Sequence, residues 1–286
     1  MQTYHLTWAT VSRQPIFSTE AARRAALHAL AAVAGAFIVL FAIVDDHLHL
    51  VIHVDPKKFG VVQRSLTKVL RRRAGAPLGR IDIRRVETRS HLNNLVGYCL
   101  KQPRHHGLRW DPATTTGSCF PDLVGARRID GLTLPLSTVL PRFELRDAFA
   151  AVSLPGTRIL PASDDALRAL GPVRLAELTG DALACSTPFA SNTPIDRRAR
   201  RVFAALATAA GFTPRDIAHA LTITHTAACR LAKLTVEPAD EHVVRVRVSL
   251  ETAAAARPIP EPAPNPRASV VSDPEPTFYQ VFGQAD

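Results

Sequence analysis

Two closely spaced histidines are the first candidates for chemistry in this sequence. His47 and His49 are separated by one apolar residue, Leu48. Residues two apart in a strand project to the same face, so both imidazoles point one way and can together hold a divalent cation. The alternative is a hydrogen-bonded polar pair on a half-buried strand. The His-Leu-His spacing alone leaves both interpretations open.

A tyrosine and a glutamine four residues apart form the second candidate. If Tyr98 and Gln102 lie on a helix, they share one face, with about 5–6 Å between their Cβ atoms. The Gln102 carbonyl can then supply an oxygen ligand to the cation held by the histidines. A phenol has an ordinary pKa of about 10, so Tyr98 needs a nearby cation or base to act as a nucleophile. The alternative is a helix tyrosine that covers the core.

The order of the predicted elements must bring these residues together. Two apolar runs of strand length are separated only by Asp45 and Asp46, which predicts a tight antiparallel hairpin. The order strand, helix, strand, strand, helix, strand is ferredoxin-like, with two helices on one face of a four-stranded antiparallel sheet, and predicts an α+β fold. We expect strands at 4–11, 37–44, 47–54 and 80–86, and helices at 19–33, 57–73 and 91–101, the last stopped by Pro103.

The second half of the chain predicts helices of a different kind. A helix at 164–178 should break at Gly171-Pro172. Helices at 196–210, 214–221 and 225–234, with a start signal at Thr213-Pro214, resemble a helix-turn-helix module. Residues 243–250 alternate valine with arginine and predict a strand or wing, and seven prolines between residues 257 and 276 predict a disordered tail. The predicted divisions are a sheet domain at 1–130, a linker of unassigned role at 131–194, a helix-turn-helix DNA-binding domain at 195–250, and the tail at 251–286.

The net positive charge of the chain is confined to its first half. Residues 1–130 contain 19 Lys and Arg against 9 Asp and Glu, whereas residues 131–286 contain 16 of each. A polyanion is the natural partner for such a surface, because neutralised phosphates release counterions. An arginine-rich composition with solvated side chains is the alternative. The residues that we expect to contact DNA are Arg71, Arg72, Arg73, Arg84, Arg85, Arg89, Arg215, His225 and Arg230.

Cysteine usage and hydropathy indicate the compartment. The four cysteines include no C-x-x-C pair and therefore predict neither a disulfide framework nor a zinc knuckle, as is typical of a reducing cytoplasm. No signal-peptide pattern opens the sequence, and the most apolar run, at 29–44, is too short and strand-like to span a membrane. We therefore expect a cytoplasmic, nucleoid-associated bacterial protein with no membrane partner.

In combination, these motifs resemble a known family. Tyr4-His5-Leu6-Thr7, Ile16-Phe17, Asp46-His47-Leu48-His49-Leu50 and Tyr98-x-x-x-Gln102-Pro103 resemble REP-associated tyrosine transposases, within the single-tyrosine HUH (insertion-sequence 200-like) transposase family. HUH stands for His-hydrophobic-His. Residues 119–126 resemble the segment that closes the HUH domain, so the resemblance covers residues 1–130.

The resemblance implies a metal-dependent single-strand DNA endonuclease and strand transferase. It implies that His47, His49 and Gln102 hold Mg²⁺ or Mn²⁺. It also implies that Tyr98 attacks the scissile phosphate, giving a 5′-phosphotyrosine link and a free 3′-hydroxyl. The implied substrate is single-stranded or hairpin-forming DNA, because the attacking group must reach an unpaired backbone. A monomer or a homodimer fits this expectation.

Two other functions use the same residues. A domesticated regulator would bind hairpin DNA through the basic surface without chemistry. A replication initiator or relaxase would share the metal site, but such proteins usually carry helicase segments, which this sequence lacks. The intact set of Tyr98, His47, His49 and Gln102 favours the transposase.

Overall fold

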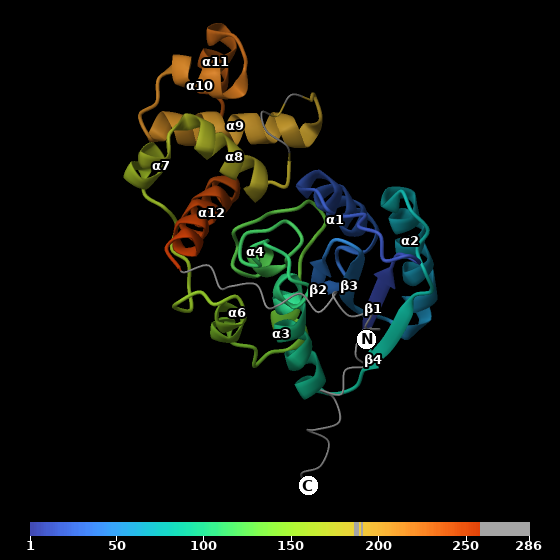
Figure 1. Cartoon of the computed structure of the whole chain (residues 1–286). Coiled ribbons are helices and arrows are strands. Elements are labelled where there is room, and N and C mark those ends of the chain that lie inside the picture. Colours follow the sequence, from blue (N-terminus) through green and yellow to red (C-terminus); the bar gives the residue numbers. More distant parts are fainter. Residues whose placement is uncertain (186–188, 190, 258–286) are drawn as a thin grey trace.

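A four-stranded antiparallel sheet forms the centre of the first half of the chain (Figure 1), in a computed structural model that describes residues 1–185, 189 and 191–257. Its strand order is β2-β3-β1-β4. The strands are β1 (Gln2–Ala9), β2 (Ile38–Ile43), β3 (His47–Val54) and β4 (Asp82–Val86). The β2–β3 hairpin turns through Asp45 and Asp46, as the apolar runs predict. The α+β class and the four-stranded antiparallel sheet are therefore confirmed.

Helices cover both faces of this sheet. α1 (Glu20–Ala34) and α2 (Pro56–Ala74) pack together on one face. There, Phe59 of α2 stacks on Tyr4 with ring centroids 4.0 Å apart, and Trp8 Nε1 donates a hydrogen bond to Thr67 Oγ1 at 3.1 Å. α3 (Arg89–His105) crosses the opposite face, where β1 and β3 present their histidines. Strand alternation therefore places Tyr4 and Trp8 on the face of α2, and the histidines of β1 and β3 on the face of α3.

The predicted end of α3 at Pro103 is wrong. The helix continues through Pro103 to His105, because the chain beyond the proline re-forms hydrogen bonds to the last turn. The N–H of His106 donates to Gln102 O at 3.1 Å, and that of Leu108 donates to Pro103 O at 2.8 Å. A proline lacks the N–H that would donate to the carbonyl four residues earlier, so Pro103 removes one hydrogen bond from the last turn of α3 without ending the helix. This extra turn carries His106 toward the sheet.

The remaining helices follow in the second half. α7 and α8 break at Gly171 and α10 spans Pro214–Leu221, both as predicted. Residues 243–250 were expected to form a strand or wing, which is wrong: they lie inside α12, which also includes the first residues of the predicted disordered tail. Valines spaced for one face of a strand also line a helix that is buried on several sides. The bounds are α4 (Phe120–Leu123), α5 (Leu136–Val139), α6 (Leu145–Ala151), α7 (Asp164–Leu170), α8 (Pro172–Ala182), α9 (Pro194–Ala209), α10 (Pro214–Leu221), α11 (His225–Leu231) and α12 (Pro238–Ala255).

The described residues form two hydrophobic cores, and the boundary between them lies after residue 130. The first core runs from the sheet to Leu154, because α5 and α6 pack on it through Leu136 and Phe149. The second core joins α7 to α11. The rest of the predicted tail, residues 258–286, lies outside the described residues. Among the described residues, no helix is both long and apolar enough to cross a membrane.

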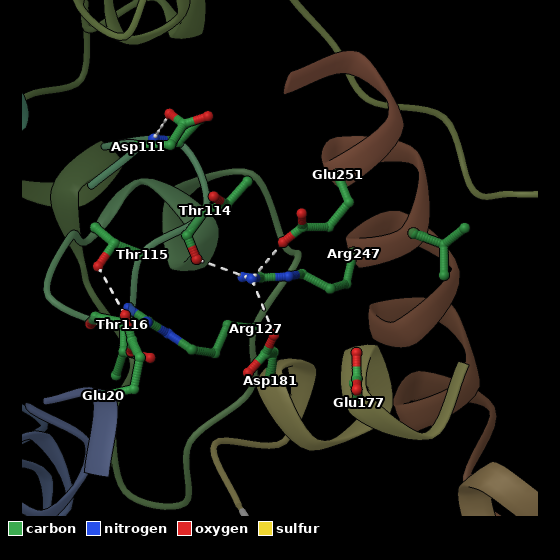
Figure 2. A network of polar contacts seen from close by, with 12 residues as sticks. Glu20, Asp111, Thr114, Thr115, Thr116, Arg127, Glu177, Asp181, Arg247 and Glu251 are labelled. Carbon is green, nitrogen blue, oxygen red and sulfur yellow. Dashed lines mark hydrogen bonds and ion pairs between the residues drawn. The ribbon is translucent and has the colours of Figure 1, made fainter. Parts of the chain in front are cut away.

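α12 connects the two cores. Val246 and Leu250 belong to the first core, whereas Val244 and Val248 belong to the second. Arg247, only 3% exposed, donates to Thr114 O at 2.8 Å and pairs with Glu251 at 2.7 Å and Asp181 at 3.4 Å (Figure 2). A buried arginine with these partners fixes the helical part against the loop before α4, because each lost partner would leave a desolvated charge.

The turn between α10 and α11 stores backbone strain at Thr222. This β-branched residue adopts the left-handed conformation, with φ 54° and ψ 45°, which costs an L residue about 1–2 kcal/mol. We expect Thr222→Gly to raise the free energy of unfolding by about 0.5–1 kcal/mol, since glycine also has more unfolded-state entropy to lose. Urea denaturation measures this change. Thr224→Ala is the matched control, because it removes the side chain that caps α11 and should lower the free energy of unfolding by about 1 kcal/mol. A Thr222→Gly protein that is less stable than the parent would contradict the strain argument.

Candidate active site

His47 and His49 lie on β3, an inner strand, beneath α3. Their exposed fractions are 1% and 4%, and their rings lie edge to face with centroids 4.8 Å apart. Leu48 between them projects to the opposite face and is fully buried. The alternation expected from the sequence therefore places both imidazoles on one face, in a site that α3 closes.

Four buried polar atoms at this place have no hydrogen-bond partner among the described residues. They are Nε2 of His47, Nε2 of His49, and both Oε1 and Nε2 of Gln102. Gln102 is 1% exposed, and its amide makes no hydrogen bond of normal geometry to His49, although it lies close enough to act on that imidazole as a weak hydrogen-bond partner, which raises the pKa of His49. Leaving buried polar atoms without partners costs about 1–3 kcal/mol each, and a cation bound between these side chains could offset that cost.

Hydrogen bonds on the other ring nitrogens orient the two histidines. Asp46 Oδ1 lies 2.6 Å from His47 Nδ1. Thr7 Oγ1 and His5 Nε2 lie 3.1 Å and 3.2 Å from His49 Nδ1. If each Nδ1 carries the proton, each Nε2 keeps a lone pair directed into the site, which is the arrangement of metal-binding histidines with an outer partner.

Burial disfavours the charged form of two imidazoles at this site, His49 and His5. The pKa of His49 lies well below its ordinary value, first because of desolvation and then because of the nearby His47, His5 and His106. Desolvation likewise lowers the pKa of His5 to about 4. A neutral imidazole is the form that can bind a cation, so His49 could act as a ligand at neutral pH without first losing a proton.

Tyr98 faces the same cluster from α3. Its ring lies edge-on to His49 with centroids 5.1 Å apart and to His5 at 6.1 Å. It is 36% exposed, whereas Gln102, one helical turn later, is almost fully buried. The helix therefore places the glutamine at the floor of the site and the phenol at its open side, where a large substrate can reach it.

The donor set fits a divalent cation. Imidazole nitrogens suit transition metals and amide oxygens suit Mg²⁺ and Mn²⁺, so Mn²⁺ matches the mixed set better than Mg²⁺. His106, whose ring lies 4.5 Å from that of His47, is a further nitrogen donor at the edge. Within the described ranges, no group of three or more His, Cys, Asp or Glu side chains has metal-binding geometry. The candidate set consists instead of two histidines and an amide.

The low pKa of His5 predicts acid sensitivity. The unfolded chain binds a proton near pH 6.5, whereas the folded chain resists it until about pH 4, so stability falls as the pH drops through that window. We expect the free energy of unfolding in EDTA to be about 2 kcal/mol lower at pH 5 than at pH 7.5 through this group alone. Urea denaturation at both pH values, for the parent protein and His5→Gln, isolates the effect; an equal pH dependence in the two proteins would contradict it.

The arginines predicted to contact DNA do not form one surface. Arg84 pairs in register with His5 and lies on the face of the histidines, whereas Arg85 pairs with Tyr4 on the face of α2. Arg71 and Arg72 line a groove of about 560 Å³ beside α2, together with three cations that we did not predict, Arg64, Lys68 and Arg80. The helical spacing of residues 64, 68, 71 and 72 is the signal that identifies them. Arg73 and Arg89 are exposed at the end of α2 and the start of α3.

The residues that we expected in a helix-turn-helix lie in the helices of the second core. Arg215 is exposed on α10, and His225 and Arg230 are exposed on α11, where the His225 ring lies 3.8 Å from Cys229 Sγ. The residues around the histidines that sequence reasoning missed are Asp46, His5 and Thr7 as orienting groups, and His106 as a neighbour. Asp46 adjoins His47 in the sequence, but only strand pairing brings His5 and Thr7 to His49.

Comparisons with protein families, curated proteins and solved structures return no match to this chain. The case for its chemistry therefore rests on the candidate site alone: two buried imidazoles, a buried amide and an accessible phenol.

Proposed function

We propose that this protein is a single-tyrosine HUH transposase, which nicks and rejoins single-stranded or hairpin-forming DNA with Mn²⁺ or Mg²⁺. The observation that carries the proposal is the set of partnerless buried atoms on His47, His49 and Gln102 beside the Tyr98 ring. A satisfied polar pair would not leave these atoms without hydrogen bonds. A bound cation would polarise the scissile phosphate and stabilise the charge that develops on it.

Some residues of the site would orient the metal ligands, and Tyr98 would carry out the attack. Asp46 holds His47, and Thr7 and His5 hold His49, so that both Nε2 atoms point into the site. The Tyr98 oxygen attacks phosphorus; an O–P bond to the tyrosine forms and the bond from phosphorus to the 3′ oxygen breaks. The proton lost by the phenol balances the proton gained by the released 3′-hydroxyl. Reversal by another 3′-hydroxyl rejoins DNA without ATP, because the phosphoester bond is conserved.

The second candidate function is hairpin-DNA binding without chemistry. The basic groove of Arg64, Lys68, Arg71, Arg72 and Arg80 favours it, because phosphate contacts need only positive charge. In either case the C-terminal helix-turn-helix would add affinity through Arg215, His225 and Arg230. A nucleoid location follows from both.

A covalent-trapping experiment separates the two functions. Full-length protein is incubated with a labelled single-stranded hairpin in Mn²⁺, Mg²⁺ or EDTA, then denatured and resolved. The transposase should give a denaturant-stable adduct in Mn²⁺ and none in EDTA. Retarded migration in native gels without any adduct in either metal would favour the binding protein.

A further inference from the structure

A second groove, of about 720 Å³, lies between the start of α9 and α11, in the helical part of the chain. Three arginines of α9, Arg197, Arg200 and Arg201, and Arg230 of α11 line it. None of the four forms an ion pair with an acidic side chain in the part of the chain that the structure describes. The neighbouring Arg198 differs, because it binds Asp240 and Asp130. Arg200 donates only to a backbone carbonyl, that of Phe189 at 3.2 Å, so the groove holds four cations whose charge no carboxylate of the described residues compensates.

The floor of this groove is apolar. Ile223, Ala227, Leu231 and Leu234 line it, and Leu234 is 48% exposed. A phosphodiester backbone would pair with the arginines but would leave these aliphatic side chains in contact with water. The groove instead matches a peptide that carries carboxylates beside large apolar side chains, as in helix-groove recognition.

The chain itself contains such a segment. Residues 272–286, which lie outside the described residues, contain the acids Asp273, Glu275 and Asp286 and no lysine or arginine. The same fifteen residues also contain three aromatic side chains, Phe278, Tyr279 and Phe282. We propose that residues 272–286 dock in the α9–α11 groove of their own chain, with carboxylates on the arginines and aromatic rings on the apolar floor.

Chain length allows this return. Arg198 Nε donates to Asp240 at 2.6 Å, so the first turns of α9, which carry the arginines of the groove, lie beside the first turn of α12. The tail leaves from the other end of α12, about 22 Å away, since the fifteen steps from Asp240 to Ala255 rise about 1.5 Å each. Residues 258–271 are rich in proline and span up to about 43 Å at about 3.1 Å per residue. The connection is therefore longer than the path that it must cover.

Docking would cover Arg230, which we also expect to contact DNA. The tail would then compete with nucleic acid for the helix-turn-helix and restrain its non-specific binding. This inference does not depend on the chemistry of Tyr98, so a protein without nuclease activity can still show it.

Photo-crosslinking in the full-length protein tests the docking. A benzoylphenylalanine in place of Tyr279 is irradiated, and the linked peptides are identified by mass spectrometry. We expect crosslinks to 194–201 and 223–234, with a yield that falls at least about fivefold in Arg197→Glu/Arg201→Glu, because the charge pairs are lost. Arg71→Glu/Arg72→Glu, which reverses the same charge at the α2 groove, is the matched control and should leave the yield unchanged.

Several outcomes would overturn the proposal. Crosslinks at the α2 groove, or crosslinks that join an isotope-labelled chain to an unlabelled one, would mean that the tail does not dock on its own α9–α11 groove. A second experiment measures the affinity for duplex DNA by fluorescence anisotropy. We expect Phe278→Ala/Phe282→Ala to raise this affinity, because the tail would no longer compete with DNA. If those substitutions leave the affinity unchanged while Arg197→Glu/Arg201→Glu weakens it, the groove is a nucleic-acid site without a tail.

Discussion

Tyr98→Phe is expected to abolish the covalent protein–DNA adduct while leaving hairpin binding intact. The substitution removes one hydroxyl from a side chain that is 36% exposed, so packing and charge hardly change. Loss of a nucleophile lowers the rate far more than loss of a binding contact, and we expect at least about a thousandfold decrease in adduct formation. Denaturing gels measure the adduct, and fluorescence anisotropy measures hairpin affinity.

The other two tyrosines serve as controls for this prediction. The chain contains only Tyr4, Tyr98 and Tyr279. Tyr4 stacks on Phe59 on the opposite face of the sheet, so Tyr4→Phe should form the adduct at the parent rate. Mass spectrometry of the digested adduct should assign the phosphotyrosine to Tyr98. An adduct that persists in Tyr98→Phe, or that maps to Tyr4 or Tyr279, would refute the proposed nucleophile.

Gln102→Leu is expected to have opposite effects on stability and on metal binding. The amide is buried and its oxygen and nitrogen have no hydrogen-bond partner among the described residues. An apolar side chain of similar size removes that unfavourable burial, so we expect the free energy of unfolding in EDTA to rise by about 1–2 kcal/mol. In the parent protein, Mn²⁺ at about a hundred times its dissociation constant should add about 2.7 kcal/mol, and the variant should lose most of that gain.

Thermal or urea denaturation with and without Mn²⁺ measures both effects. Gln63→Leu is the matched control: Gln63 donates to Thr67 Oγ1 on α2, away from the histidines, so its removal should leave the Mn²⁺ effect intact. A Gln102→Leu protein that is less stable in EDTA yet keeps the full Mn²⁺ stabilisation would mean that Gln102 is a structural residue. The adduct assay should decline together with the metal effect.

The local parts of the fold were predictable from the sequence. The β2–β3 hairpin follows from two apolar runs around Asp45 and Asp46, and the start of α10 follows from Thr213 and Pro214. Both depend on neighbours within a few residues, where turn and capping chemistry dominate. The prediction for residues 243–250 was wrong because burial on several sides, not the valine–arginine alternation, made them part of α12.

The candidate site likewise has a part that the sequence determines and a part that only the tertiary structure decides. The sequence by itself determined that His47 and His49 share a face of one strand and that Tyr98 and Gln102 share a face of one helix, since backbone geometry fixes these spacings. Only the tertiary structure decided that α3 lies over that face, that β1 brings His5 and Thr7 to His49, and that His106 returns beside His47. The physical reason is that these contacts join residues far apart in the chain, and sheet pairing and core packing set their distances. No local sequence pattern specifies the sheet pairing or the core packing that sets these distances.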